Sequence, residues 1–258
     1  MKYTEQNKLT KAQQEQVKTL LDRCRRKENF SLSFPMHEPH TKFFLAEDED
    51  GTVRGALALC CFSSSEYEIL AFTDPDLRRQ GIFRKLWDSA RMTLPGNTEE
   101  AVQVRAAVDE ACLDAAEALK ALSARFRSEE LEMRGSTERA SEGAGSDYAF
   151  RKTAKPDQDG AICYEAADKV TRESVFRSYI IPYAADRCFV LRVSVRKGLE
   201  GKGIGSHVFP EFMRVLAKEG YHTVTLQVSG ANAAAVKLYE KAGFEITRSL
   251  KYYEIPLR

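Results

Sequence analysis

The chain has 258 residues, of which 43% are hydrophobic and 30% charged, and its formal net charge is +1. This hydrophobic content suffices for globular cores, and the length suits two domains of ordinary size. The near-zero net charge gives no reason to expect nucleic-acid or membrane-surface binding, and no apolar run approaches the ~20 residues of a membrane span.

The predicted elements of the first half follow from apolar periodicity and turn residues. Thr10 and Gln13 form an expected capping box at the start of the first helix. Ser63–Ser65 is expected to close a hairpin between two strands. In chain order we predict helix 11–27, strands 42–47, 53–62 and 66–73, helix 82–93, strand 101–108, helix 110–124 and strand 128–134.

The second half begins after a small, polar and aperiodic segment, 136–147, which is typical of a linker between domains. Pro210 removes a backbone donor and is expected to kink the helix that contains it or to mark an irregular start. The predicted elements are strands 148–154, 161–167, 173–181 and 188–195, helix 203–219, strand 222–229, helix 232–242 and two closing strands.

A glycine-rich stretch joins the strand 188–195 to the helix 203–219. Amide N–H groups at the start of a helix have no intrahelical acceptor, and the helix dipole adds partial positive charge there. Glycines such as Gly203 and Gly205 let a phosphate approach this backbone closely. The stretch therefore predicts a site for the phosphates of a nucleotide.

Two well-known phosphate-binding loops do not fit this stretch. A P-loop requires Ser or Thr after Gly-Lys, but Gly201-Lys202 is followed by Gly203. The dinucleotide-binding pattern requires a glycine where Ser206 or Val208 stands.

The stretch does fit the pattern R/Q-x-x-G-x-G/A, with Glu200, Gly203 and Gly205 at the patterned positions. A second motif, Asn232–Phe244, reads N-A-A-A-V-K-L-Y-E-K-A-G-F. With the valine-rich strand before the loop, the two motifs resemble the GNAT family of N-acetyltransferases, whose second motif is N-x-x-A-x-x-L-Y-E-x-x-G-F. The resemblance covers about residues 148–258.

The resemblance implies that acetyl-CoA binds along the loop, with no metal ion involved. In the family, the strand before the loop splays from its neighbour and offers unpaired N–H groups to the acetyl carbonyl. The implied cofactor-binding residues lie on this strand, in the loop and at the cap of the second helix: Val193, Val195, Gly201, Lys202, Gly203, Ile204, Gly205, Ser206 and Asn232. Asn232 could also be only a helix cap.

Tyr239 is the implied general acid. When an amine attacks the thioester, CoA leaves as a thiolate of pKa near ~8.5, and a phenol of pKa about 10 can protonate it. Outside the motif, Tyr239 would be an ordinary packed aromatic residue.

The general base is not assigned, because the strand 188–195 offers no carboxylate. Glu66, Glu68 and Asp186 are candidates elsewhere in the chain. Glu200 departs from the usual Arg or Gln, and its carboxylate would repel phosphates unless it points to solvent or to Lys202.

The first half carries a degenerate copy of the same pattern, from Arg78 to Phe83. Such self-similarity indicates two related domains. We align Gly81 with Gly203 and Phe126 with Phe244, which sets Asp114 against Asn232 and Ala121 against Tyr239. On this alignment the first half lacks the general acid, so the second half alone is expected to catalyse transfer. Arg78 and Gly81 are retained in the first half, so CoA binding there stays open.

The second half has no counterpart of the helix 11–27, although family members usually wall the acceptor site with that region. We therefore expect the first half to supply this wall. The acceptor would enter between the halves near Tyr179, Tyr183 and the segment 173–186.

These observations predict an α/β (α+β) fold with two tandem GNAT-like domains, each a central mixed, mostly antiparallel sheet flanked by helices. The expected division is a degenerate domain at 1–135, a linker at 136–147 and an acetyltransferase domain at 148–258. The expected acceptor is a primary amine on a small molecule or peptide. The alternative is a non-catalytic acyl-CoA sensor or interaction module.

The cellular context follows from composition. The polar start Met1–Gln6 lacks the apolar centre of a signal peptide, which favours a cytoplasmic location. A monomer or homodimer is expected. The six cysteines have no CxxC spacing and are interpreted as reduced core residues, without metal. Neither nucleic acid nor a membrane is expected as a partner.

Overall fold

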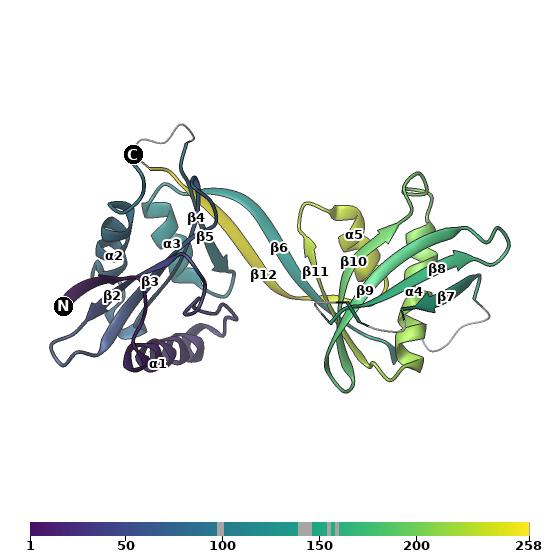
Figure 1. Cartoon of the computed structure of the whole chain (residues 1–258), viewed down its shortest axis with the longest axis horizontal. Coiled ribbons are helices and arrows are strands. Elements are labelled where there is room, and N and C mark those ends of the chain that lie inside the picture. Colours follow the sequence, from purple (N-terminus) through teal and green to yellow (C-terminus); the bar gives the residue numbers. More distant parts are fainter. Residues whose placement is uncertain (97–100, 139–145, 154–155, 158–159, 258) are drawn as a thin grey trace. The chain divides into compact units, whose positions relative to one another are not determined.

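The computed structural model describes residues 1–96, 101–138, 146–153, 156–157 and 160–257. The chain forms two compact units, Met1–Ser128 with Leu250–Arg258 (unit 1) and Glu129–Ser249 (unit 2). Each unit consists of a mixed sheet with helices packed against it, as the α/β (α+β) class predicts (Figure 1).

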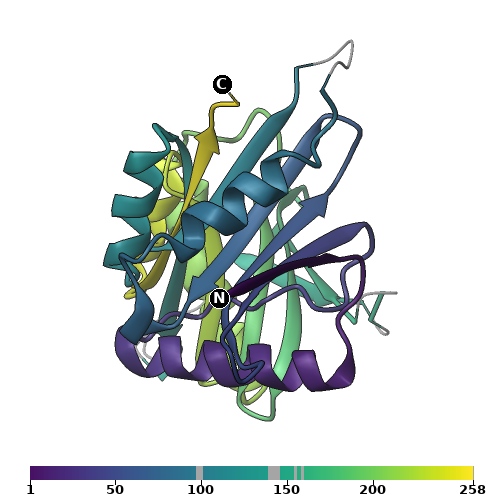
Figure 2. The same ribbon diagram turned by 90° about the vertical axis from the view of Figure 1, so that its left-hand side faces the viewer.

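Up to Ala121, the described residues of unit 1 form five strands, three α-helices and one 3-10 helix. These are β1 (Lys2–Gln6), α1 (Lys11–Glu28), β2 (Thr41–Glu47), β3 (Val53–Cys61), β4 (Glu66–Thr73), η1 (Pro75–Leu77), α2 (Ile82–Arg91), β5 (Gln103–Asp109) and α3 (Leu113–Ala121). Neighbouring strands from β1 to β4 pair antiparallel, whereas β4 and β5 run parallel. The helix α2 crosses the face of this sheet that Figure 2 turns toward the viewer.

Unit 2 repeats this plan without an equivalent of α1 among its described residues. Its elements are β7 (Tyr148–Lys152), β8 (Ile162–Asp168), β9 (Ser174–Ala184), β10 (Arg187–Val195), α4 (Ile204–Lys218), β11 (Thr223–Ser229) and α5 (Ala233–Lys241). The strands from β7 to β10 pair antiparallel, whereas β10 and β11 run parallel.

Two long strands, β6 (Arg125–Ser136) and β12 (Glu245–Ile255), contribute residues to both units. The second part of β6 pairs with β11, from Glu130↔Ser229 to Ser136↔Thr223. The end of β12 pairs with β5, from Leu250↔Asp109 to Ile255↔Val104. Each sheet is therefore completed by a strand from the other side of the division expected at 136–147, of which 139–145 lie outside the described residues.

Several predicted elements differ from the structure in their bounds. The helix predicted at 110–124 is shorter, because Cys112 is its N-cap and Leu122 its C-cap. The two closing strands are the single strand β12, and β1 was not predicted. Pro210 lies inside α4, which continues through it.

Local signals account for the helix starts. The predicted capping box of α1 is confirmed, since the Gln13 N–H donates to Thr10 Oγ1 at 3.2 Å and the Thr10 N–H to Gln13 Oε1 at 3.0 Å. Both α2 and α4 begin after a left-handed glycine, Gly81 with φ 80° and Gly203 with φ 81°. The chain thus turns in the same way from a sheet strand into a helix in both units.

Close packing in unit 2 requires a glycine on β6. A Cβ at Gly135 would lie 2.6 Å from the ring of Phe244, which belongs to the unit 2 core. Residues on either side of it, Arg134 and Ser136, are exposed. The sequence indicates no reason for this glycine, because its partner lies more than a hundred residues away along the chain.

Gly135→Val is expected to destabilise unit 2 by about 1–3 kcal/mol, the usual cost of forcing extra carbon into a packed core. Chemical unfolding followed by circular dichroism would measure the effect. The matched control is Arg134→Val, which places the same side chain on the exposed face and should change stability by less than about 0.5 kcal/mol. Equal stabilities for the two variants would contradict this packing argument.

Candidate functional site

A wedge opens between two parallel strands of unit 2. β10 and β11 pair only from Arg187↔Thr223 to Val190↔Leu226, after which the register ends. On its other side β10 stays paired with β9, and the Arg196 N–H donates to the Val175 carbonyl at 2.9 Å. Because backbone groups alternate along a strand and the Arg196 N–H points to β9, the backbone groups of Val195 face the wedge.

A β-bulge lies on β10 at the mouth of this wedge. The register shifts between Leu191 and Ser194, and Arg192 takes the left-handed conformation with φ 51°. The guanidinium of Arg192 sits over the ring of Tyr179, 5.4 Å from its centroid. A bulge bends a strand and re-aims its backbone groups. The sequence carries no signal for it, since an arginine gives no sign of a positive φ.

The glycine-rich loop follows β10 directly. Gly198, Gly201 and Gly203 all have positive φ, between 73° and 87°. The amides of Ile204 and Gly205 lie in the first turn of α4, where no intrahelical acceptor exists. The Ser206 N–H donates to the Gly203 carbonyl at 3.0 Å. Lys202 is exposed beside these amides, so the loop combines free donors with a cation, as phosphate binding requires.

Glu200 does not extend from the loop. Its carboxylate accepts a hydrogen bond from the Gly198 N–H at 2.8 Å and so folds back onto the loop backbone. This differs from the two orientations considered from the sequence, solvent or Lys202. The carboxylate thereby stabilises the turn before the helix.

The loop, the end of β10 and the helix α5 meet at one glycine. A Cβ at Gly205 would lie 3.6 Å from Leu238 and 3.7 Å from Val195. Asn232 caps α5, because the Ala235 N–H donates to its side-chain oxygen at 3.1 Å. The capping role is confirmed, and a cofactor-orienting role for Asn232 stays a prediction.

Tyr239 follows Leu238 on α5 and is buried in the unit 2 core at 6% exposure. Its ring lies 5.1 Å from that of Phe209 and 6.0 Å from that of Phe244. Burial raises the pKa of the phenol to about 12. The phenol therefore keeps its proton throughout the neutral range, as a general acid must.

The raised pKa also makes Tyr239 a weaker acid. Transfer of its proton to a thiolate of pKa near ~8.5 in water would be uphill by roughly 5 kcal/mol. The same desolvation raises the pKa of a thiolate inside the protein, which narrows this gap. The pKa values of a phenol and a thiol that are both buried are thus closer to each other than the difference between about 12 and ~8.5 suggests.

The candidate bases lie apart from the wedge or in the other unit. Asp186 precedes β10, and roughly 20 Å of extended strand separate it from Val193. Glu66 and Glu68 are on β4 of unit 1, where Glu66 pairs with Arg105 at 3.2 Å and burial raises the pKa of Glu68. The general base is therefore not assigned to any of these three residues.

The internal repeat is confirmed in outline, but its alignment in the second motif was wrong by two residues. The Ala124 N–H donates to the Leu119 carbonyl just as the Phe244 N–H donates to the Tyr239 carbonyl. At the helix starts, the Cys112 N–H donates to the Asp109 carbonyl just as the Asn232 N–H donates to the Ser229 carbonyl. Each helix buries one residue, Leu119 in α3 and Tyr239 in α5. The residue in the place of Tyr239 is therefore Leu119 and not Ala121, and that in the place of Asn232 is Cys112 and not Asp114.

The incorrect alignment rests on residue type alone, since Phe126 and Phe244 are both phenylalanines. Hydrogen bonding shows instead that Ser123, with φ 54°, corresponds to Gly243, with φ 85°. The aromatic residue at 126 lies on an exposed part of β6. The conclusion that unit 1 lacks a tyrosine acid is unchanged, since a leucine stands in that place.

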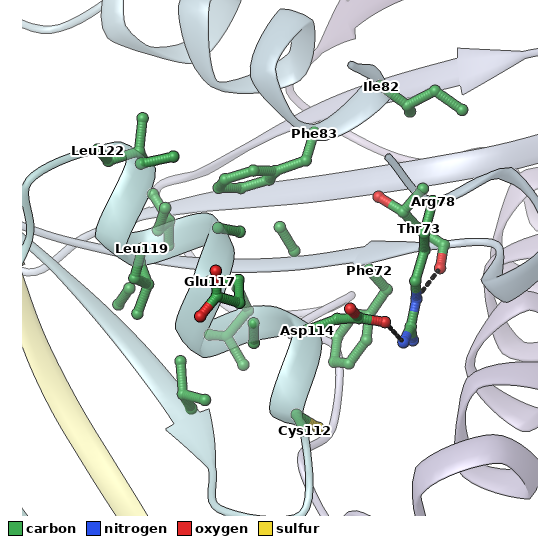
Figure 3. Close-up of a pocket in the computed structure, with 18 of the residues that line it drawn as sticks. Phe72, Thr73, Arg78, Ile82, Phe83, Cys112, Asp114, Glu117, Leu119 and Leu122 are labelled. Atoms are coloured by element: carbon green, nitrogen blue, oxygen red, sulfur yellow. Dashed lines mark hydrogen bonds and ion pairs between the residues drawn. The ribbon is translucent and has the colours of Figure 1, made fainter. Parts of the chain in front are cut away.

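Unit 1 contains a wedge of the same kind. β4 and β5 pair from Glu66↔Gln103 to Ile69↔Ala106 and then diverge, without a bulge on β4. A cavity of about 330 Å³ lies there, lined by β4, β5, α2 and α3 (Figure 3). Arg78 of the degenerate loop lies at its edge and donates to Asp114.

Comparison with known proteins identifies the family of the second half of the chain. Residues 148–244 match the family model described as Acetyltransferase (GNAT) family. This part of the chain is a GNAT domain, and the wedge, the glycine loop and Tyr239 all lie within it.

Solved structures that are similar over the whole chain include a GCN5-related N-acetyltransferase and a tandem GNAT protein. A GCN5-related N-acetyltransferase from Sphaerobacter thermophilus is 14% identical with a TM-score of 0.71, over 99% of this chain and 96% of that one. A tandem GNAT protein from the clavulanic acid biosynthesis pathway is 15% identical with a TM-score of 0.67, over 100% and 99%. At these identities the likeness shows the fold alone.

A curated relative matches a shorter segment. The spore coat polysaccharide biosynthesis protein SpsD of Bacillus subtilis (strain 168) is 33% identical over 70 residues, which is 27% of this chain and 24% of that protein. The match thus spans about a quarter of the relative's length.

Two negative findings concern only the described ranges. Within them, no helix has the length and apolar character needed to cross a membrane. The same ranges contain no group of three or more His, Cys, Asp or Glu residues arranged to hold a metal ion.

Proposed function

We propose that the chain is an N-acetyltransferase that moves the acetyl group of acetyl-CoA to the primary amine of a small molecule or peptide. The observations that carry the proposal lie in unit 2: an open strand wedge, helix-start amides beside it, and a buried, protonated tyrosine that follows Leu238, the α5 residue beside Gly205. The GNAT match over 148–244 supports it.

In the proposed mechanism the loop binds the coenzyme and the wedge orients its thioester. The amides from Gly201 to Gly205, with Lys202, hold the diphosphate, and backbone groups of Val193 and Val195 bind the pantetheine arm and polarise the acetyl carbonyl. These roles rest on the wedge and loop geometry described above.

The chemical step forms a C–N bond, breaks the C–S bond and includes two proton transfers. The neutral amine attacks the thioester carbonyl carbon, the C–S bond breaks, and the sulfur leaves with the electron pair. Tyr239 donates its proton to this sulfur, and the proton lost by the amine passes to solvent. The Tyr239 phenolate regains a proton from water, which its pKa of about 12 makes favourable.

Tyr239→Phe is expected to lower kcat by about 10²–10⁴-fold, the usual contribution of a general acid. The affinity for CoA should stay within about threefold, because the ring still packs against Phe209 and Phe244. Release of free CoA thiol from acetyl-CoA, measured across a panel of amines, gives kcat, and calorimetry gives the Kd.

The matched control is Tyr221→Phe, which removes a phenol that precedes β11, outside the wedge. It should leave kcat within about twofold. If Tyr239→Phe turns over as fast as the parent chain, Tyr239 is not the acid.

A non-catalytic acyl-CoA sensor is the second candidate. The absence of a carboxylate on β10 favours it, since no residue there could take the proton of an ammonium acceptor. The same thiol-release assay separates the two, because a sensor binds CoA without releasing thiol for any amine. In either case we propose a cytoplasmic protein, monomeric or homodimeric, without nucleic-acid or membrane partners, in keeping with its net charge of +1.

A further inference from the structure

Arg192 lies at the β-bulge on β10, where this strand leaves its pairing with β11. Its guanidinium sits over the ring of Tyr179, and the neighbours of Tyr179 on β9, Ser178 and Ile180, are fully buried. Because side chains alternate along a strand, Tyr179 and Arg192 are on the sheet face opposite the core. The helices α4 and α5 contribute to the core cluster that contains Ile180. Arg192 is therefore on the face from which a molecule can approach the wedge without passing these helices.

The guanidinium of Arg192 has no acidic partner. The side chain is exposed, and among the described residues Arg192 forms no ion pair. The strands β9, β10 and β11 together carry three arginines and neither aspartate nor glutamate. The contact with the Tyr179 ring uses the positive charge of the guanidinium but leaves its N–H donors available for an anion.

The acidic residues on the neighbouring elements are either partnered or distant. Glu165 on β8 accepts a hydrogen bond from Arg177 at 2.9 Å, and Asp186, in the turn before β10, lies 3.6 Å from Arg187. Glu130 on β6 forms no ion pair within the described ranges, but β11 and the open wedge separate it from β10. With neighbouring strands roughly 5 Å apart, this separation is at least ~10 Å, at which salt screens exposed charges. The other acids of the surrounding segments have partners: Glu132 with Arg134, Glu173 with Arg196, Asp168 with the N–H groups of Val170 and Thr171, and Glu200 with the Gly198 N–H.

The phosphates of the coenzyme are not the expected partner of Arg192. The loop proposed to hold them leads through Gly203 into α4, which packs on the core face. Arg192 is on the opposite face, before the end of β10 at Val195. A molecule that reaches the wedge from that face meets the free guanidinium first, and in acetyl transfer this molecule is the acceptor.

We propose that Arg192 determines acceptor specificity by binding an anionic group, a carboxylate or a phosphate, on the acceptor. The assignment rests on the function proposed above and names its substrate class: primary amines that also carry an anionic group. A guanidinium binds either anion through paired N–H donors. The anionic group is unchanged by the reaction, so Arg192 positions the acceptor and takes no part in making or breaking bonds.

Four amines with the same five-methylene spacer and different distal groups test this specificity. They are ε-aminocaproate, ω-aminopentylphosphonate, ε-aminocaproamide and hexamethylenediamine. Thiol release from acetyl-CoA gives kcat/KM for each amine with the full-length chain. We expect the better of the two anionic amines to exceed the amide by about tenfold or more, the usual worth of a charge-assisted hydrogen bond, and the amide to exceed the diamine. The better anionic amine shows whether the site prefers a carboxylate or a phosphate.

Three variants separate anion binding by Arg192 from a structural role. Arg192→Gln keeps an unbranched side chain at the positive φ of the bulge, and it should bring the four kcat/KM values within about threefold of one another. Arg192→Lys should keep the order of the amines with smaller ratios, because lysine retains the charge but lacks the planar fork. The matched control is Arg187→Gln, at the paired end of β10. It should leave the order unchanged, since Arg187 already lies beside Asp186.

A binding experiment keeps the test independent of acetyl transfer. The Nε–Hε NMR signal of Arg192, assigned by its loss in Arg192→Gln, should shift on titration with the better anionic amine and not with the amide. Equal kcat/KM values for the four amines, an anion preference that survives Arg192→Gln, or equal NMR shifts with both ligands would overturn the proposal. If no amine releases thiol, the function proposed above is wrong, and the NMR titration alone then decides whether Arg192 binds the anionic group.

Discussion

Gly203→Val is expected to abolish CoA binding to the chain. Gly203 precedes α4 with φ 81°, a conformation that β-branched residues strongly disfavour. A Cβ there meets only His207, at 3.8 Å, so the damage is to the turn and its amides and not to the core. Losing two or three charge-assisted hydrogen bonds of about 1.5–3 kcal/mol each raises the Kd by at least ~100-fold.

The repeat supplies a matched control for this change. Gly81 has φ 80° at the start of α2, and a Cβ there would have no neighbour within 4 Å. Gly81→Val therefore introduces the same backbone strain in unit 1, and both variants should lose similar stability. Calorimetric titration with CoA should show binding for Gly81→Val and none for Gly203→Val. Equal loss in both variants would show that strain alone, and not the unit 2 loop, is responsible.

The fragment 148–258 is expected not to fold, although it contains the whole segment of GNAT resemblance. It lacks the part of β6 that pairs with β11 over Glu130–Ser136. It also lacks Gly135, whose backbone covers Phe244 in the unit 2 core. An unpaired central strand exposes both backbone groups and apolar surface, so aggregation is the expected result.

The longer fragment 129–258 retains this strand and should unfold cooperatively. Both fragments lose the β5 partner of β12, so that defect cancels in the comparison. Circular dichroism melts and size-exclusion chromatography measure the difference. A cooperative melt of 148–258 at the temperature of 129–258 would contradict the argument.

This result changes how the expected acceptor wall is tested. An inactive 148–258 fragment would reflect the missing strand and would say nothing about an acceptor site. The fragment 129–258 is the informative one: full activity with amines would exclude a contribution of the first half near Tyr179 and Tyr183.

Local signals carried much of the prediction. The capping box of Thr10 and Gln13, the cap at Asn232 and the left-handed glycines at both helix starts depend on residues within a few positions of one another. The match over 148–244 has the same origin, because the glycine-rich loop and the Asn232–Phe244 motif are each a run of contiguous residues.

Features that depend on segments far apart in the chain were not predicted correctly from the sequence. Only the backbone hydrogen bonds show that Leu119 corresponds to Tyr239. Aligning Phe126 with Phe244 by residue type sets Ala121, two residues further along, against Tyr239. The bulge at Arg192 and the closeness of Gly135 to Phe244 also leave no mark in the sequence.

The amino-acid sequence by itself determined the two related halves and the GNAT resemblance, and it named the candidate phosphate-binding loop and Tyr239 as candidate acid. Only the tertiary structure decided which strands complete each sheet, where the repeat aligns and where the cavity of unit 1 lies. The physical reason is range: caps, turns and helix starts depend on neighbours in the chain, whereas strand pairing and cavity volume depend on residues that folding alone brings together.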